Sequence, residues 1–169
     1  YISYTTSKHN TDTNAVKAYN IKESPEGISF MIEGKKYVIP VIGKYNVSNA
    51  LAAISTLRVL GVDDKNMNTL LKDFSSVQGR MNVLQKEPFM IIVDFAHTPN
   101  ALKSALESVS KLKKKNSKII LVFGCASKRD DYKRPIMGGY AKKYADITIL
   151  TAEDCRMESL KKINDEIEK

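Results

Sequence analysis

Apolar residues in the second half of this chain occur in three runs, and each run is followed by polar residues and then by a helical pattern. The runs cover residues 90–93, 118–123 and 146–151. Apolar runs that alternate with amphipathic helices predict parallel strands buried on both faces. Parallel strands end at the same edge of a sheet, where ligands bind. We therefore expect the polar residues after the three runs to gather along one rim.

The helices of this half show clear start signals. Thr98 is a predicted N-cap, with Pro99 at the first helical position and an apolar stripe after it. A second helix is predicted to begin near Pro135. The last helix is marked by apolar residues at helical spacing, which are Leu160, Ile163 and Ile167. This half is therefore predicted to be a doubly wound, Rossmann-like α/β unit with parallel strands.

The first half predicts a smaller, mixed α/β arrangement. Strands are expected over residues 18–21, 28–32 and 37–42, a turn over 33–36, and helices over 47–60 and 67–74. Gly61 suits the left-handed position beyond a helix C-terminus. The stretch 75–79 has hinge composition, so we predict two domains, residues 1–78 and 79–169.

The start of the chain shows no pattern that predicts a targeting signal. Neither a charged-then-apolar leader nor a long apolar span follows Tyr1, so we predict no signal peptide, no membrane segment and a cytoplasmic location. The chain begins without Met and stops at or just after a helix. We therefore expect a cut front end and further strands downstream.

Composition narrows the kinds of partner. The chain has 27 Lys and Arg against 19 Asp and Glu, and its net charge of +8 favours anionic partners. The lysines are spread along the chain with little aromatic interleaving, so we expect no nucleic-acid partner, whereas a phosphorylated small molecule suits the charge. Cys125 and Cys155 have no framework spacing and are expected to be reduced, small filling residues.

Four motifs in the chain resemble those of one enzyme family. Residues 43–53 resemble the G-x-x-N-x-x-N-A-x-A-A stretch of the Mur ligases, and residues 79–81 resemble their G-R-[MF]-E hinge. Residues 94–99 are close to the D-Y-A-H-T-P that opens their C-terminal domain. Residues 123–138 resemble the F-G-C-G-G-D-R-D-x-x-K-R-P-x-M-G run of the MurE branch. Four motifs in the right order, over nearly the whole chain, make the resemblance specific.

The resemblance implies an activity and its reactants. Mur ligases use ATP and magnesium to convert a carboxylate into an acyl phosphate, and the amine of an amino acid then attacks it to form an amide. In the MurE branch the carboxylate belongs to UDP-MurNAc-L-Ala-D-Glu, and the amine comes from meso-diaminopimelate or L-lysine. We therefore expect ATP and Mg²⁺ as cofactors, these two substrates, and a monomer. The first domain would be the end of a central ATPase domain, and the second most of a C-terminal domain.

The resemblance also assigns nucleotide-binding residues, which are Asn46, Asn49, Arg80, Asp94 and His97. An amide such as Asn49 both donates and accepts, which suits adenine, and Asp94 is expected to accept from the ribose hydroxyls. His97 is expected beside the nucleotide, and His97 and Lys133 are the candidate catalytic groups. The alternatives are structural: a helix-start amide for Asn49, a capping acid for Asp94 and a structural histidine.

Three further residues are candidates for binding the incoming amino acid, which are Arg129, Asp154 and Arg156. A planar guanidinium can hold a carboxylate bidentately. The alternative is a salt bridge, and the acids available for it are Asp130, Asp131 and Glu153. Lys133 and Arg134 are predicted at a helix start, where the helix dipole disfavours cations, which favours a ligand-facing or interdomain role.

The chain departs from the family pattern in three places. Residues 126–128 are Ala-Ser-Lys where the family has G-G-D, so the loop loses glycine freedom and gains a positive charge. Residues 153–156 replace D-N-P-R; the retained Arg156 favours meso-diaminopimelate, whereas Asp154 adds a charge that attracts an amine and leaves L-lysine open. Asn82 replaces the Glu of the hinge motif.

One motif of ATP-dependent ligases is absent. The chain contains no G-x-x-x-x-G-K-[ST] loop, which supplies a phosphate cradle, so we expect the chain alone to be inactive. Three other interpretations stay open. They are another ligase of the superfamily, such as folylpolyglutamate or cyanophycin synthetase, a ligase-derived binding domain without catalysis, and a basic RNA-binding domain.

Overall fold

The computed structural model describes residues 3–7 and 15–169, so Tyr1 lies outside the described part. The chain divides into two compact units, unit 1 (Tyr1–Asp94) and unit 2 (Phe95–Lys169), and each has its own hydrophobic core. In the described part, no helix combines the length and the apolar composition needed to span a membrane.

Unit 1 is built on an antiparallel sheet with the strand order β3–β4–β5. Its strands are β3 (Tyr19–Ser24), β4 (Gly27–Ile32) and β5 (Lys35–Ile39). Ile28, Phe30 and Ile32 are buried from one face of β4, as their alternation predicted. The predicted turn joins β4 to β5 through left-handed residues at 33 and 34. A short parallel pair precedes the sheet, β1 (Tyr4–Thr5) with β2 (Val16–Lys17).

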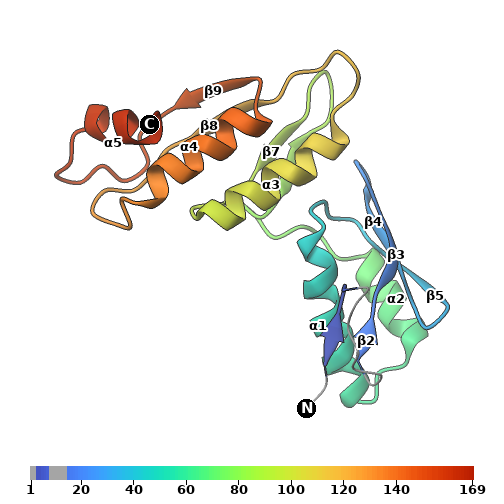
Figure 1. Ribbon diagram of the computed structural model, residues 1–169. Coiled ribbons are helices and arrows are strands. Elements are labelled where there is room, and N and C mark those ends of the chain that lie inside the picture. The colour runs from blue at the N-terminus through green and yellow to red at the C-terminus, as the bar shows by residue number, and fades with distance from the viewer. Residues whose placement is uncertain (1–2, 8–14) are drawn as a thin grey trace. The chain divides into compact units, whose positions relative to one another are not determined.

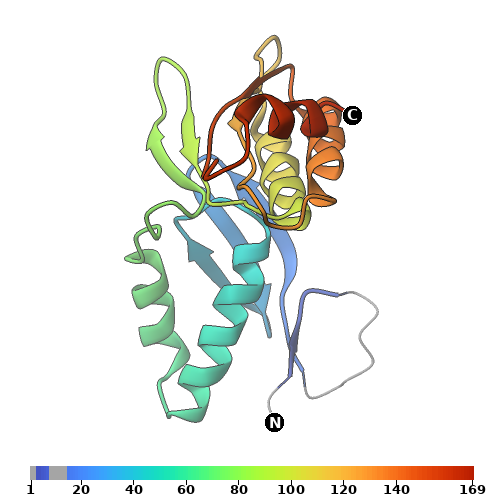
Figure 2. The same cartoon turned by 90° about the vertical axis from the view of Figure 1, so that its left-hand side faces the viewer.

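Two helices cover one face of this sheet, α1 (Tyr45–Val59) and α2 (Asp64–Lys72) (Figure 2). Val47, Leu51 and Ile54 of α1 join the core formed with β4 and β5. Gly61 follows α1 with a φ of +80°, as predicted. The second helix begins three residues earlier than predicted because the Asp63 side chain accepts hydrogen bonds from the N–H groups of residues 65 and 66.

The last two strands of unit 1 form an antiparallel hairpin, β6 (Asn82–Gln85) and β7 (Ile91–Val93). The sequence pattern predicted a parallel strand for this apolar run, and that prediction is wrong for β7. The reason is the short connection at residues 86–90, because a few residues can join antiparallel strands but not parallel ones.

Unit 2 alternates helices and strands (Figure 1). Its elements are α3 (Pro99–Leu112), β8 (Ile120–Phe123), α4 (Lys133–Tyr144), β9 (Ile147–Leu150) and α5 (Leu160–Ile167). Strands β8 and β9 pair in parallel across α4, as predicted. The Thr98 side chain caps α3 by accepting from the Ala101 N–H at 3.3 Å, and Pro99 begins the helix, also as predicted.

All three helices of unit 2 join one core with the same face of the β8–β9 pair. Leu121 and Phe123 point into this core, whereas Ile120 and Val122 are 59% and 58% exposed. Ile147 and Ile149 of β9 are exposed as well. The prediction of strands buried on both faces is therefore wrong for β8 and β9, because the described helices cover one face only. Leu160, predicted on the buried stripe of α5, is also exposed.

Two glycines of unit 2 allow close backbone approaches. A Cβ on Gly124, at the end of β8, would collide with the carbonyl oxygen of Thr151 beyond β9. A Cβ on Gly138 in α4 would collide with the carbonyl oxygen of Ile167 at the end of α5. Both positions therefore require glycine for packing rather than for backbone freedom, since neither has a positive φ.

The contact at Gly138 yields a stability prediction. Gly138→Ala is expected to lower the free energy of unfolding by about 1–3 kcal/mol, because α4 and α5 must move apart. Gly139→Ala is the matched control, because a Cβ there meets nothing within 4 Å, and it is expected to raise stability by up to about 1 kcal/mol. Urea unfolding of both variants checks this, and equal effects would contradict the packing role.

Candidate functional site

The predicted adenine-binding amides lie in the first turn of α1. The Asn46 side chain donates to the carbonyl oxygen of Ile42 at 2.8 Å and accepts from the Asn49 side chain at 3.0 Å. Asn46 therefore fixes the start of the helix. Asn49 is exposed, and its side-chain oxygen has no hydrogen-bond partner among the described residues. Asn49 is thus the amide that remains able to accept from a ligand.

Asp94 connects the start of α1 to the predicted hinge. One of its carboxylate oxygens accepts from the N–H of Met81 at 2.7 Å and from the hydroxyl of Tyr45 at 3.3 Å. Burial raises the pKa of Tyr45, and the charge of Asp94 and its hydrogen bond raise it further. Met81 is buried with a φ of +45°, and Arg80 beside it is exposed. Asp94 is therefore held in place before any ligand binds.

Sequence reasoning missed the part played by Tyr45. The residue lies at an unspecified position of the motif over 43–53, and no local pattern distinguishes a tyrosine that bonds an acid 49 positions away. Gly43 allows this arrangement, because a Cβ there would press on the Tyr45 ring and on the Met81 side chain. The local structure around Asp94 therefore involves three separate stretches of unit 1.

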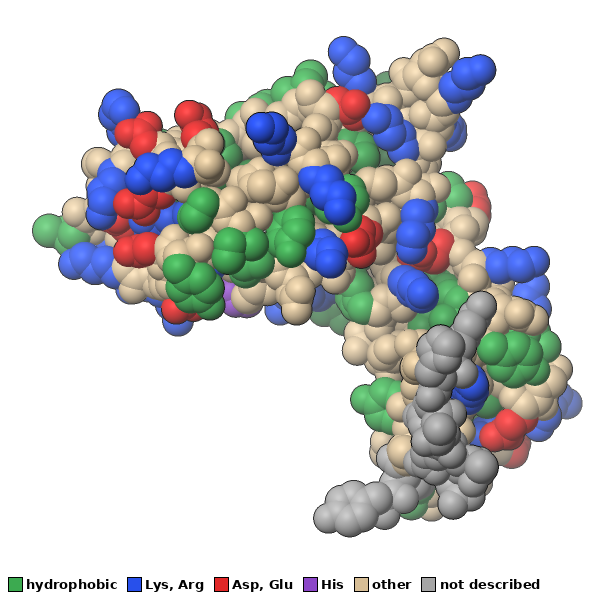
Figure 3. Space-filling view, in the orientation of Figure 1, with side chains coloured by type: hydrophobic (Ala, Val, Ile, Leu, Met, Phe, Trp, Pro, Cys, Tyr) green, Lys and Arg blue, Asp and Glu red, His purple; other side chains and the backbone are tan. Residues whose placement is uncertain are grey.

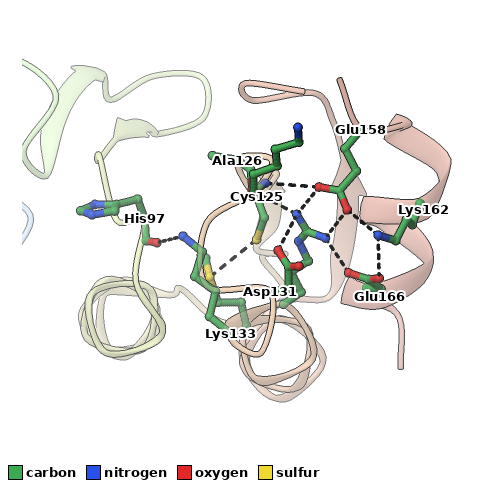
Figure 4. A network of polar contacts seen from close by, with 11 residues as sticks. His97, Cys125, Ala126, Asp131, Lys133, Glu158, Lys162 and Glu166 are labelled. Carbon is green, nitrogen blue, oxygen red and sulfur yellow. Dashed lines mark hydrogen bonds and ion pairs between the residues drawn. The ribbon is translucent and has the colours of Figure 1, made fainter. Parts of the chain in front are cut away.

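The two candidate catalytic residues are neighbours in unit 2. The Lys133 side chain is buried, and its Nζ donates to the backbone carbonyl oxygen of His97 at 2.8 Å (Figure 4). The His97 side chain is exposed, with its ring 4.6 Å from that of Phe95 between centroids. Lys133 thus anchors the segment that carries His97, and it reaches that residue through the backbone rather than the imidazole.

The candidate acceptor residues lie on two loops of unit 2, the Arg129 loop (residues 124–132) and the Arg156 loop (residues 151–159). The loops are joined directly, because the Ser127 N–H donates to the carbonyl oxygen of Asp154 at 2.8 Å. Arg129 is exposed and has no ion pair among the described residues. Arg156 pairs through Nε with Asp154 at 2.9 Å, and both side chains are about half exposed. The structure therefore brings the three predicted residues onto adjoining loops.

The salt-bridge alternative is formed by Arg156 and not by Arg129. Arg156 pairs with Asp154 rather than with the suggested Glu153, and Asp131 pairs with Arg134 at 3.2 Å rather than with Arg129. The loops also carry left-handed backbone at residues 128, 130 and 156. Ala126 and Ser127 stand where the family has glycines, and neither has a positive φ. The backbone at these two positions therefore does not require glycine.

Arg134 is the centre of an ionic network in unit 2, and its partners Asp131, Glu158 and Glu166 are labelled in Figure 4. Its side chain is fully buried, and it donates to Glu158 at 2.9 and 3.1 Å, to Glu166 at 2.5 Å and to the carbonyl oxygen of Ala126 at 3.2 Å. The predicted ligand-facing or interdomain role is therefore wrong for Arg134. The hydrogen bonds that Arg134 donates to Glu158 raise the pKa of Arg134, and they hold the pKa of Glu158 well below its usual range. Both groups are thus charged at neutral pH.

Cys125 and Cys155 are both free thiols in the core region of unit 2, as the prediction of reduced filling residues states. Cys125 is buried with its sulfur 3.8 Å from that of Met137, and burial raises the pKa of its thiol. Among the residues that the structure describes, no three His, Cys, Asp or Glu side chains come together as a metal site.

Charged side chains of both signs mix on the face of unit 2 shown in Figure 3. Around α5, basic and acidic side chains alternate instead of forming a patch of one sign. Several are ion-paired there, such as Lys161 with Asp165 at 2.6 Å and Lys162 with Glu158 at 2.8 Å. This face therefore lacks the concentrated positive charge that typifies a nucleic-acid groove.

Comparison with known proteins gives related ligases. The chain is 36% identical over 139 residues to the UDP-N-acetylmuramoyl-L-alanyl-D-glutamate–2,6-diaminopimelate ligase of Prochlorococcus marinus. The aligned region covers 78% of this chain and 27% of that protein. The chain is 36% identical over 156 residues to the ligase of the same name in Clostridioides difficile. That aligned region covers 89% of this chain and 32% of the relative. The chain therefore spans about a third or less of the length of these relatives.

Solved structures support the same relationship. A structure of a UDP-N-acetylmuramoyl-L-alanyl-D-glutamate–2,6-diaminopimelate ligase matches with a TM-score of 0.60 and 27% identity, covering 95% of this chain and 33% of that one. The UDP-N-acetylmuramate-alanine ligase of Thermotoga maritima matches with a TM-score of 0.74 and 24% identity, covering 93% of this chain and 36% of that one. The second match shows a shared fold.

The family assignment rests on the second half of the chain together with these relatives. Residues 79–169 match the model of the family described as "Mur ligase, glutamate ligase domain". That range contains β8, α4 and β9 and both loops that carry the candidate acceptor residues. This chain therefore belongs to the Mur ligase family.

Proposed function

We propose that this chain is part of an ATP-dependent ligase that joins the amine of a diamino acid to a carboxylate of UDP-MurNAc-L-Ala-D-Glu in peptidoglycan synthesis. The observation that carries the proposal is the joined pair of loops bearing Arg129, Asp154 and Arg156, in a chain whose relatives have names that specify this dipeptide and 2,6-diaminopimelate. ATP transfers its γ-phosphoryl group to the carboxylate and leaves as ADP, the amine attacks the resulting acyl phosphate, and inorganic phosphate leaves as the amide forms and the amine loses a proton.

The acceptor is proposed to be meso-diaminopimelate. Its distal end carries both a carboxylate and an amine, and the adjacent Arg156 and Asp154 offer one charged group for each. Only Nε of Arg156 contacts Asp154, which leaves the Nη atoms to hold a carboxylate bidentately. Arg129, which has no acid partner in the described part, supplies a second cation on the adjoining loop. L-lysine, whose distal end is an amine alone, would engage Asp154 but would leave Arg156 without a carboxylate.

Nucleotide binding is proposed for the residues near the start of α1 and the hinge, which are Asn46, Asn49, Arg80 and Asp94. The exposed oxygen of Asn49 suits the adenine amino group, and Asn46 holds Asn49 through their mutual hydrogen bond. Asp94 is preoriented by Tyr45 and Met81, which suits an acceptor for ribose hydroxyls. Mg²⁺ accompanies ATP in such chemistry, and we assign it no ligand in this chain.

His97 is also proposed to contact the nucleotide, since its ring is exposed. Lys133 is proposed to support it, because its Nζ already holds the His97 carbonyl oxygen and would have to leave it to act on a reactant. A domain boundary near residue 79 stays a proposal: the family match begins there, whereas the two compact units of the structure divide after Asp94. A cytoplasmic location, a monomeric state and the inactivity of the chain alone stay predictions.

The reaction itself is tested with the complete gene product that carries this sequence. Phosphate release is measured with ATP, magnesium and UDP-MurNAc-L-Ala-D-Glu, and with meso-diaminopimelate, L-lysine or no amino acid. We expect release that depends on meso-diaminopimelate. Release with L-lysine alone would reject the acceptor assignment, and no release from folded protein would reject the proposed function in favour of another ligase substrate or a binding role.

Two variants test separately the proposed amino-acid-binding residues and the proposed nucleotide-binding residues. Arg156→Ala is expected to raise the KM for the amino acid by roughly tenfold or more and to leave the KM for ATP nearly unchanged, because a bidentate contact is lost. Asp94→Asn is expected to do the reverse. Steady-state phosphate release measures both constants, and equal changes of both constants in either variant would contradict its assignment.

A further inference from the structure

We propose that Arg134 is a positioning residue that fixes the acceptor-binding loops of unit 2. The inference rests on the proposed function and adds to it, because Arg134 is fully buried and cannot touch a substrate itself. It would act through the Arg129 loop and the Arg156 loop, which carry the three candidate acceptor residues.

The contacts of Arg134 reach both loops at once. In the Arg129 loop it donates to the carbonyl oxygen of Ala126 at 3.2 Å and pairs with Asp131 at 3.2 Å. At the end of the Arg156 loop it binds Glu158 through both Nη atoms, at 3.1 and 2.9 Å. One side chain on α4 thus bonds both loops, and the Ser127–Asp154 backbone hydrogen bond joins them to each other.

Glu158 extends this coupling back to the other loop. The Glu158 carboxylate also accepts from the Lys128 N–H at 3.4 Å, next to Arg129, and its own N–H donates to the carbonyl oxygen of Cys155 at 2.9 Å, next to Arg156. Lys128 and Arg156 have φ values of +51° and +43°, an arrangement that costs free energy and persists only where surrounding contacts impose it. The Arg134–Glu158 pair provides such contacts on both loops.

The chemistry of the network requires a guanidinium. Arginine presents its donors in a rigid planar fork, so its two Nη atoms reach Glu158, Glu166 and Ala126 in different directions. A lysine at the same position has one nitrogen with three donors and cannot span these partners. Arg134→Lys therefore keeps the charge but loses the simultaneous hold on the two loops.

Two residues of the same network serve as controls because they do not contact the Arg129 loop. Glu166 on α5 binds Arg134 and Lys162, and Glu166→Gln weakens the attachment of α5. Lys162 is 57% exposed and pairs with Glu158 and Glu166 from the solvent side. If Arg134 served stability alone, the destabilised Glu166→Gln variant would also bind the acceptor more weakly.

The test uses the complete gene product, and phosphate release gives the KM for meso-diaminopimelate and for ATP while thermal melting reports stability. Arg134→Lys and Glu158→Gln are expected to raise the acceptor KM roughly ten- to a hundredfold with an ATP KM within about twofold of wild type. Glu166→Gln is expected to lower the melting temperature without this rise in acceptor KM. Lys162→Ala is expected to change neither KM.

Three results would overturn the inference: an unchanged acceptor KM in Arg134→Lys and Glu158→Gln, a parallel rise of both KM values, or a rise in Glu166→Gln as large as theirs. If Arg134→Lys does not fold, Glu158→Gln decides, and failure of both to fold would assign the network to folding only. Wild-type protein that releases no phosphate with any amino acid would instead refute the proposed function, which keeps the two failures distinct.

Discussion

The burial of the Arg134 guanidinium is the constraint on which the organisation of unit 2 depends. A cation removed from water is tolerated only when acids and carbonyl oxygens surround it, and losing one partner is strongly destabilising. Its partners come from the loop before α4, from the end of the loop after β9 and from α5. These segments must therefore meet around one side chain, and that requirement, together with the close approach at Gly138, sets the position of α5 against α4.

Unit 1 uses the same principle on a smaller scale. The Asp94 carboxylate holds a buried backbone N–H at Met81 and the hydroxyl of Tyr45, which orders the start of α1 beside the hinge. In both units a charged side chain is held by bonds within the fold, and an exposed arginine lies next to a backbone group that this side chain holds or a few residues away: Arg80 adjoins Met81, and Arg129 lies in the loop that Arg134 contacts. Preorganised groups of this kind bind with less loss of conformational entropy, which suits the proposed alignment of separate reactants.

The sequence predicted what depends on local chemistry. The alternation in β4, the Thr98 cap with Pro99 and the left-handed Gly61 are all features of a few consecutive residues. The antiparallel pairing of β7 and the open face of β8 were not predicted, because an apolar run does not specify its partner strand or what covers it. The enclosure of Arg134 was missed for a similar reason: Glu158 and Glu166 lie 24 and 32 positions away. The candidate acceptor residues were grouped correctly because they follow two strands that are adjacent and parallel.

Amide hydrogen exchange reports whether Arg134 couples the Arg129 loop to the Arg156 loop. The informative amides are those of Ser127 and Lys128, which bond Asp154 and Glu158, with Leu102 in α3 as an internal reference. If Arg134 couples the loops, Arg134→Lys accelerates exchange at Ser127 and Lys128 and leaves Leu102 unchanged. Unchanged exchange at Ser127 and Lys128, or equal acceleration at all three amides, would contradict it.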